Sequence, residues 1–385
     1  MKIPFRYNLS SMWVRRVGTA MTIMGIGLTA SIVVSMMAMV HGLEATLLET
    51  GHDDDLVVLH QGSPNEVYSF FTRDCFRIIR YLPGVQKGEG GEPLAVGELV
   101  VVMDQVRRSG AVGNVTIRGA SDLSFSLRPE VTMVAGRRFR KGSREINVSR
   151  ALSERFQSME LGDSIHFSRS DWNVVGIFDS GGTAYDSEVW ADYGQVCDEW
   201  NWPICSSVLI RPENAAAARD ITRRIASDQR MSLQVIPQKK LYADQTSSSA
   251  GIRALGYFVA LMLGIGATFA AMNMMYGTLM SRSSEVATLR SLGFRGRNII
   301  ASLMMESVAL GLAGGVLGCL FALPMHGIAA STVNLQTFNE ILFNFRITPA
   351  IILGGLLYGA AVGAAGGYLP ARRAAQIRLI DLMRE

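Results

Sequence analysis

The sequence lacks the residue patterns that catalysis and metal binding need. Its four cysteines include no Cys-x-x-Cys pair and its five histidines are scattered, so no zinc site is predicted. It also lacks a phosphate-binding Gly-x-x-x-x-Gly-Lys-Ser/Thr loop, a Gly-x-Ser-x-Gly elbow and a His-Glu-x-x-His helix. The net charge of +4 is too small to indicate a nucleic-acid partner. We therefore expect a non-catalytic chain with no metal or cofactor of its own.

Two of the cysteines stand near each other in the sequence. Cys197 and Cys205 form a disulfide if they lie in an oxidising compartment, and otherwise they are two half-buried thiols. The sequence does not decide between these alternatives.

Charged residues are nearly absent from four long stretches and common elsewhere, which is typical of a membrane protein with a large aqueous domain. The first stretch, Val17 to Val40, has no charge and is long enough for a helix to cross the ~30 Å hydrocarbon core. It exceeds the apolar segment of a signal peptide, so we expect an uncleaved anchor. The other stretches are Ala254 to Ser281, Ile299 to Met325 (interrupted only by Glu306) and Ile347 to Leu369.

Basic residues in the short flanking segments indicate the orientation. Four basic residues and no acid precede the first stretch, and basic residues also outnumber acids in residues 282–298 and 370–385. Short loops rich in Lys and Arg stay in the cytoplasm. Both termini are therefore expected in the cytoplasm, and the segment between the first two stretches outside it.

Together these observations predict the fold class, a membrane protein of four transmembrane α-helices with a large α+β periplasmic domain inserted between helices 1 and 2. The expected segments are a cytoplasmic N-terminus (1–16), the first helix (17–41), the periplasmic domain (42–251), the second helix (252–281), a cytoplasmic link (282–298), the third helix (299–326), a short periplasmic loop (327–346), the fourth helix (347–369) and a cytoplasmic tail (370–385).

The large domain alternates short apolar runs with amphipathic stretches. Strands are predicted at residues 56–59, 99–103, 114–118, 172–178, 208–210 and 233–236, and helices at 73–82 and 214–226. Asp53-Asp54-Asp55 lacks the spacing of a calcium loop, so we expect a solvated turn there.

Small residues recur along the predicted membrane helices. Gly355, Gly359, Gly363 and Gly367 stand four residues apart in the fourth helix, and Gly311 and Gly315 have the same spacing in the third. Small residues at this spacing let helix backbones approach closely in lipid, which predicts tight packing within the subunit. Glu306 would lie about a third of the way into the membrane, so an ion pair with an arginine of the cytoplasmic link is expected in preference to a proton relay.

The whole chain resembles the MacB/FtsX-type permeases, the mechanotransmission class of ABC transporters. The resemblance rests first on the link and third helix, where Ser283-Ser-Glu-Val-Ala-Thr-Leu-Arg-Ser-Leu-Gly-Phe294 is followed by Glu306 and Gly314-Gly315. Residues 21–27 (Met-Thr-Ile-Met-Gly-Ile-Gly) and 370–375 (Pro-Ala-Arg-Arg-Ala-Ala) are similar to the family's first helix and tail. In the large domain, Gly136-Arg-Arg-Phe139 and Leu161-Gly-Asp163 resemble the MacB-like periplasmic core.

The resemblance implies a dimer of permease chains at the bacterial inner membrane. We expect the second chain to be an identical copy, and a heterodimer is the alternative. Each chain would dock on one of two ATPase subunits, which bind ATP and Mg²⁺, through the link between helices two and three. The residues implied in this coupling are Glu285, Val286, Leu289, Arg290, Leu292 and Gly293. The apolar ones recur at helical spacing, as expected of a helix that sits in a groove. An amphipathic helix lying on the membrane surface is the alternative.

The family implies export or extraction of a substrate from the periplasm or outer leaflet, driven by a separate ATPase as in DevC-like or LolC/LolE permeases. The alternative is an FtsX-like regulator of a cell-wall hydrolase that transports nothing. The large domain exceeds that of FtsX members, which favours transport. The substrate, and the presence of a periplasmic adaptor and an outer-membrane channel, stay open.

Overall fold

The computed structural model describes residues 16–376 except 229, 247–248, 281–284, 286–287, 289, 292–293 and 334–339. The chain divides into two compact units. The helical unit comprises residues 1–42, 251–328 and 345–385, and the α/β unit comprises residues 43–250 and 329–344. Each unit is described by itself.

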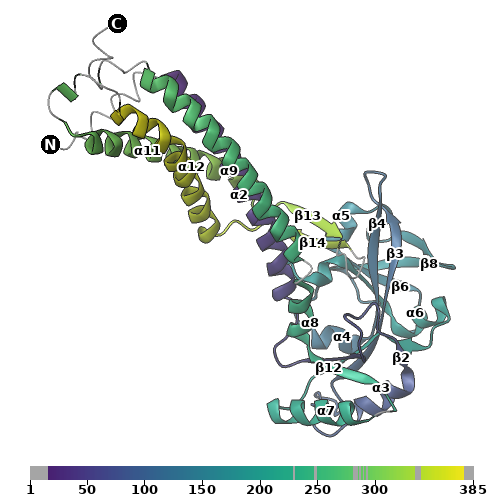
Figure 1. Cartoon of the computed structure of the whole chain (residues 1–385). Coiled ribbons are helices and arrows are strands. Elements are labelled where there is room, and N and C mark those ends of the chain that lie inside the picture. Colours follow the sequence, from purple (N-terminus) through teal and green to yellow (C-terminus); the bar gives the residue numbers. More distant parts are fainter. Residues whose placement is uncertain are drawn as a thin grey trace. The chain divides into compact units, whose positions relative to one another are not determined.

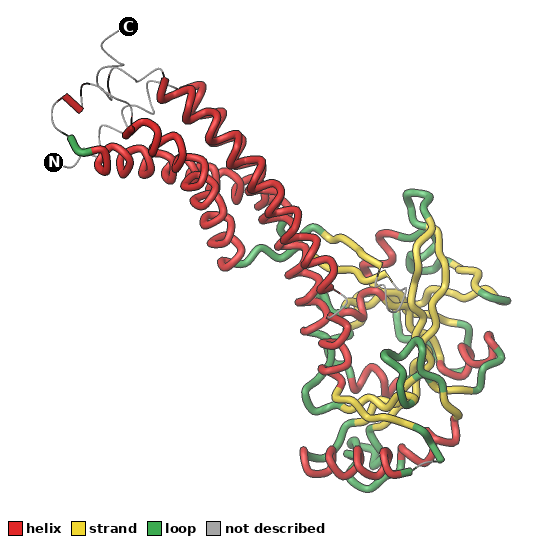
Figure 2. Tube along the Cα trace, in the orientation of Figure 1, coloured by secondary structure: helices red, strands yellow, loops and turns green. Residues whose placement is uncertain are grey.

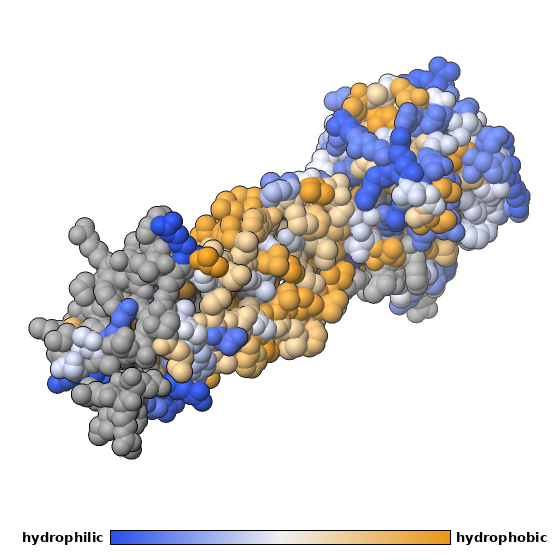
Figure 3. Space-filling view, turned by 90° about the horizontal axis from the view of Figure 1, so that it is seen from above, coloured by the Kyte–Doolittle hydropathy of each residue, from blue (hydrophilic) through white to orange (hydrophobic). Residues whose placement is uncertain are grey.

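The helical unit consists of long helices (Figure 1). Within the described residues, four helices are long and apolar enough to cross a membrane. They are α2 (Arg16–Leu48), α9 (Ser249–Met280), α11 (Gly296–Ala322) and α12 (Pro349–Gln376). Apolar side chains cover most of the visible face of these helices in Figure 3. The predicted fold class is confirmed: four candidate spans, with a mixed α/β domain between the first two.

The α/β unit is built on a ten-stranded sheet in the order β12-β1-β11-β3-β4-β9-β6-β8-β5, with β7 paired to β8. Most neighbouring strands are antiparallel, but β4 runs parallel to β9 and β6 parallel to β8. The strands are β1 (Leu56–His60), β3 (Ala95–Val106), β4 (Val112–Ala120), β5 (Thr132–Gly136), β6 (Glu145–Ser149), β7 (Ser164–Phe167), β8 (Ser170–Asp179), β9 (Glu188–Asp192), β11 (Ser207–Ile210) and β12 (Leu233–Pro237).

Short helices connect and cover these strands (Figure 2). They are α3 (Arg73–Arg80), α4 (Asp122–Leu127), α5 (Arg150–Arg155), α6 (Tyr193–Trp200), α7 (Ala215–Ser227) and α8 (Gln238–Gln245), with a 3-10 turn η1 (Ala184–Ser187). Helix α7 shows how the local sequence determines where one of these helices begins and which face is buried. The Asn214 side chain caps it by accepting the N–H groups of Ala216 and Ala217 at 3.0 and 2.9 Å, and Ile221 and Ile225 are buried.

Two apolar clusters form most of the core of the α/β unit. One gathers side chains of β3, β4, β6, β8 and β9 with α5 and α6, including the fully buried Trp172. The other lies among β1, β11, β12, α3 and α7 and includes Ile79, Val208 and Ile221. Burial of these side chains is the main favourable term in folding the unit.

Two further strand pairs stand outside the main sheet. Strand β2 (Phe71–Thr72) pairs with β10 (Ile204–Cys205). Strand β13 (Ala329–Val333) pairs with β14 (Glu340–Asn344), so residues expected only as a short loop form a two-stranded ribbon. The apolar run Ile341-Leu342-Phe343 is typical of a buried strand. In the structure all three side chains are buried.

Candidate functional site

The predicted glycine row lies where α12 crosses α11. A Cβ atom built on Gly359 would stand 2.4 Å from the Gly311 carbonyl oxygen, and one on Gly311 would stand 2.3 Å from the Gly359 carbonyl oxygen. Gly315 likewise faces the carbonyl of Gly355, at 3.0 Å. Real Cβ contacts to backbone are longer than this, so only glycine allows the two helices to approach so closely.

The same row continues toward the end of α12. Gly363 and Gly367 approach Ser307 of α11, at 2.4 Å from its carbonyl oxygen and 2.1 Å from its hydroxyl for a built Cβ. A second glycine pair of α11 faces another helix: Gly314 lies against Ile26, and Gly318 against Ala30, both in α2. Helix α11 therefore packs closely on two neighbours through two separate glycine pairs.

The expected coupling link falls largely outside the described residues. Val286, Leu289, Leu292 and Gly293 are among the residues that the structure does not describe, and their predicted role stays a prediction. Glu285 is exposed, and Arg290 donates from Nη1 to the carbonyl oxygen of Ala375 near the end of α12 at 2.8 Å. Glu306 is half-buried in α11, and its expected ion pair with an arginine of the link also stays a prediction.

The β13–β14 ribbon belongs to the α/β unit although it lies between α11 and α12 in the chain. Leu342 is buried in the larger apolar cluster, and its N–H donates to the Ser187 hydroxyl at 2.8 Å. Arg107, directly after β3, donates from Nη2 to Glu340 Oε2 at 2.5 Å. The Glu340 side chain is only 2% exposed, so this pair is largely shielded from water.

A glycine, an oxygen without a hydrogen-bond partner and a small cavity surround the Arg107–Glu340 pair. Gly113 of β4 leaves the space that the pair needs, because a Cβ there would stand 2.7 Å from Arg107 Nε and 2.8 Å from Glu340 Oε2. The second oxygen, Glu340 Oε1, has no hydrogen-bond partner in the described protein. Glu340 also lines a cavity of about 40 Å³ together with Glu66, Arg118 and Glu188, which is room for an ordered water.

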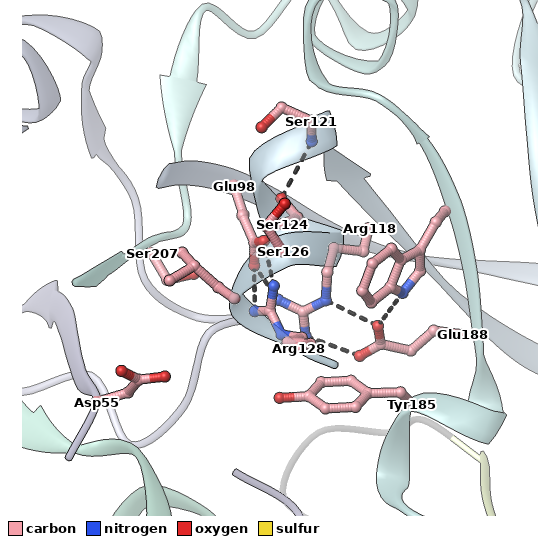
Figure 4. Close-up of polar contacts among 12 residues, drawn as sticks. Asp55, Glu98, Arg118, Ser121, Ser124, Ser126, Arg128, Tyr185, Glu188 and Ser207 are labelled. Atoms are coloured by element: carbon pink, nitrogen blue, oxygen red, sulfur yellow. Dashed lines mark hydrogen bonds and ion pairs between the residues drawn. The ribbon is translucent and has the colours of Figure 1, made fainter. Parts of the chain in front are cut away.

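A buried ionic network lies inside the α/β unit, and Figure 4 shows its residues Glu98, Arg118, Arg128 and Glu188. Arg118 contacts three carboxylates: those of Glu188 at 2.7 Å through both Nε and Nη2, Glu66 at 3.0 Å and Glu98 at 2.7 Å. Arg128 makes two parallel hydrogen bonds to Glu98, at 2.6 and 2.7 Å. Three acids and two arginines are thus held together away from solvent.

The arginines decide the protonation of this network. Burial alone would raise the pKa of Glu98, but Arg128 and Arg118 outweigh it and lower that pKa to about 2. For Glu66, burial also acts upward, and Arg118 still leaves the pKa below its ordinary value. Glu66 and Glu98 are therefore ionised at neutral pH, and their charges are compensated by arginine hydrogen bonds.

One expectation about acidic residues is wrong. Asp55 does not lie in a solvated turn: its side chain is fully buried and accepts hydrogen bonds from Arg211 Nε and Nη2 at 2.7 and 2.6 Å. Only Asp53 and Asp54 of the acidic run are exposed. Burial of a carboxylate is tolerated because the guanidinium donates to both of its oxygens. Within the described residues no group of acids, cysteines or histidines could hold a metal ion.

The cysteines are free thiols in the structure. Cys197 and Cys205 are both buried. The Tyr193 hydroxyl lies 3.2 Å from the Cys205 sulfur, and Cys197 donates to the Ile204 carbonyl oxygen at 3.7 Å. Burial raises the pKa of the Cys205 thiol to about 11. Neither thiol has the lowered pKa of a reactive cysteine.

Two family models match the chain. A model described as the MacB-like periplasmic core domain matches residues 19–227, and a model described as the FtsX-like permease C-terminal matches residues 257–379. The first model alone covers more than half of the chain. The family resemblance inferred from the sequence is therefore confirmed.

Named relatives agree with these models. The pyoverdine export ATP-binding/permease protein PvdT of Pseudomonas entomophila is 25% identical over 400 residues, which covers 95% of this chain and 57% of that protein. The macrolide export ATP-binding/permease protein MacB of Mannheimia succiniciproducens is 27% identical over 126 residues, covering 33% of this chain and 18% of that protein. The chain thus spans only part of the length of these relatives.

Among solved structures, the extracellular domain of the noncanonic ABC-type transporter YknZ from Gram-positive bacteria matches 47% of this chain and 99% of its own length. The TM-score is 0.37 and the sequence identity is 16%.

Proposed function

The chain belongs to the MacB/FtsX-type permeases of ABC transporters, and we propose from this premise that it transmits motion from a separate ATPase to its α/β unit. ATP binding and hydrolysis on two partner ATPase subunits would move the membrane helices of a permease dimer. The α/β unit, placed in the periplasm, would follow that motion and drive export or extraction of a substrate. The chain itself would carry out no chemistry.

The observation that supports this proposal most is the path of the chain through the α/β unit. Helices α2 and α9 lead into and out of residues 43–250, and α11 and α12 are joined by the ribbon that belongs to the same unit. All four candidate spans therefore connect by a short stretch of chain to one compact body. A shift of any of them is passed to that body through covalent connections.

Two sets of contacts would hold the α/β unit together during such transmission. The Arg107–Glu340 pair and the burial of Leu342 fix the ribbon to the sheet. The buried network of Arg118 and Arg128 ties β3, β4 and β9 together through charge-assisted hydrogen bonds. A unit held in this way moves as a body, because local bending would leave buried charges without partners.

Co-purification is the first test. We would isolate the tagged chain from its native membranes in mild detergent and identify the bound proteins by mass spectrometry. A stoichiometric ATPase with a phosphate-binding loop is expected. A chain that stays alone with nucleotide present would contradict the proposal, and a bound cell-wall hydrolase would replace transport by regulation.

A second experiment addresses the coupling link. Leu289→Asp places a charge on the face expected to dock on the ATPase, and Thr288→Asp places the same charge one residue away. Only the first variant is expected to abolish ATP hydrolysis by the reconstituted complex while the chain folds normally. Equal activity of the two variants would remove the coupling role.

A further inference from the structure

A strongly basic loop stands out on the α/β unit. Residues 137–144, Arg-Arg-Phe-Arg-Lys-Gly-Ser-Arg, join β5 to β6 and carry five cationic side chains and no acid. In the α/β unit as a whole, acidic residues outnumber basic ones. The loop is therefore a local concentration of positive charge on an otherwise acidic body.

The backbone of this loop is fixed by buried anchors. Phe139 is only 5% exposed, and its N–H donates to the Asn147 side chain at 3.0 Å. The same side chain donates to the Arg137 carbonyl oxygen at 2.8 Å. A tight turn follows, closed by the Ser143 N–H on the Arg140 carbonyl at 3.2 Å, with Gly142 at a φ of 78°. Because the backbone is already ordered, little conformational entropy is lost when a ligand binds.

Two of the five cations have partners among the described residues, and three have none there. Arg137 donates to both oxygens of Glu145 at 2.6 Å, and the Arg138 guanidinium lies 4.5 Å from the centre of the Phe125 ring. The side chains of Arg140, Lys141 and Arg144 are exposed, and none of them pairs with an acid among the described residues. Three uncompensated charges therefore flank a single turn.

We propose that this loop binds the phosphate of an anionic lipid headgroup. Arginine presents two parallel N–H donors that match a pair of phosphate oxygens, and lysine adds a point charge. A headgroup is small enough to contact the turn alone. An extended acidic polypeptide would reach beyond the turn onto a unit in which acidic residues outnumber basic ones, and like charges would repel it. The inference deepens the proposed function, on which it rests, by naming the chemical class that the α/β unit recognises.

The test uses the full chain in a neutral detergent and measures binding of dihexanoyl phosphatidylglycerol by microscale thermophoresis. The loop variant is Arg140→Gln, Lys141→Gln, Arg144→Gln. The control variant removes the same charge from exposed residues of α7 and α8, as Arg219→Gln, Arg223→Gln, Lys240→Gln. We expect the loop variant to bind about tenfold or more weakly, and the control to bind like the unaltered chain.

Phosphatidylcholine, inorganic phosphate and a polyglutamate peptide test whether the loop prefers an anionic lipid headgroup. Dihexanoyl phosphatidylcholine, which has no net charge, is expected to bind more weakly than phosphatidylglycerol, and inorganic phosphate is expected to compete poorly. Equal weakening in the loop and control variants, or none in either, would overturn the proposal. So would inorganic phosphate or a polyglutamate peptide that binds more tightly than phosphatidylglycerol.

Failure of this inference can be told apart from failure of the proposed function, because lipid binding is measured without an ATPase. A chain that binds phosphatidylglycerol through the loop but recruits no ATPase refutes the proposed function. A chain that recruits an ATPase while its loop variant binds lipid normally refutes the inference. Tryptophan fluorescence of each variant checks that it is folded.

Discussion

Arg107 and Glu340, which are 233 residues apart in the chain, form an ion pair that fixes the ribbon between α11 and α12 to the tip of the β3–β4 hairpin. The two partners differ in exposure, with side chains 31% and 2% exposed. Removing one partner therefore has a different consequence from removing the other. The arginine left alone can reach water, whereas the carboxylate left alone stays buried.

We expect Arg107→Met to loosen the ribbon more than Glu340→Gln does. The first change leaves a buried carboxylate without its cation, which costs about 3 kcal/mol, whereas the second leaves a partly hydrated guanidinium and costs about 1 kcal/mol. The double variant should be more stable than Arg107→Met alone. Hydrogen exchange at the amides of Ile341 to Phe343 measures the loosening. Equal protection in the two single variants would contradict this difference, and protection equal to that of the unaltered chain would show that the pair does not hold the ribbon.

The Arg107–Glu340 contact between the ribbon and the sheet could not be predicted from the sequence. Glu340 and Arg107 belong to segments that no local pattern connects, and their pairing depends on the order of strands in the sheet. The core strands were predictable, because Leu56 to Leu59 and Trp172 to Phe178 show continuous or alternating apolar residues. The buried network was not, since Arg118 and Glu98 are charged residues that a pattern assigns to the surface.

The spacing of the glycines gave a more specific prediction than the positions of the charged residues did. The four-residue repeat in α12 predicted close packing without naming the partner helix, and in the structure these glycines lie on the face toward α11. The sequence could not tell which of the overlapping pairs in α11 faces α12. The structure assigns Gly311 and Gly315 to α12, and Gly314 and Gly318 to α2.

Substitution within α12 tests this packing with a matched control. In Gly359→Ala the new methyl group would stand 2.4 Å from the Gly311 carbonyl oxygen, a backbone atom that cannot turn away. In Gly354→Ala its nearest contact is the Met37 sulfur at 3.9 Å, an ordinary distance. We expect the first variant to lose about 1–3 kcal/mol of stability and the second to lose none. Thermal unfolding in detergent measures both, and equal midpoints would contradict the close approach.

Acid should unfold the α/β unit through its buried carboxylates. The folded-state pKa of Glu98 lies at about 2, below its ordinary value of 4.5, because Arg128 and Arg118 outweigh burial. A carboxyl group with a lowered pKa stabilises the folded state above its unfolded pKa, and this contribution disappears as pH falls toward the folded pKa. Stability is therefore expected to fall as pH decreases from about 4.5 to about 2.

Trp190 is a suitable probe of this transition. Its indole N–H donates to Glu188 at 2.8 Å, so Trp190 adds a signal from the network to the fluorescence of the chain's five tryptophans. We expect Glu98→Gln to be less stable at neutral pH and to depend less on pH below 4.5. Glu89→Gln, at an exposed position, should keep the original pH dependence. An unchanged acid transition in Glu98→Gln would show that another group controls it.

The three cysteine thiols of the α/β unit differ in their exposure to solvent. Their reactivity therefore tests how the core of this unit is packed. Cys75 is half-buried near the start of α3, whereas Cys197 and Cys205 are buried beside Tyr193. Burial also raises the pKa of Cys205 to about 11, which leaves little thiolate at pH 8. Only the thiolate reacts with alkylating reagents, so iodoacetamide should modify Cys75 first and the other two only after unfolding.

Mass spectrometry of peptides from native and urea-treated samples would measure this order. The Cys75→Ser variant provides the control, because its native form should then take up almost no label in the α/β unit. Rapid native labelling of Cys205 would contradict its burial. If Cys197 and Cys205 stayed unlabelled even in urea and became reactive only after reduction, the chain in its native membrane would contain the disulfide in place of the two free thiols. That outcome would also place the α/β unit in an oxidising compartment, as its proposed periplasmic location requires.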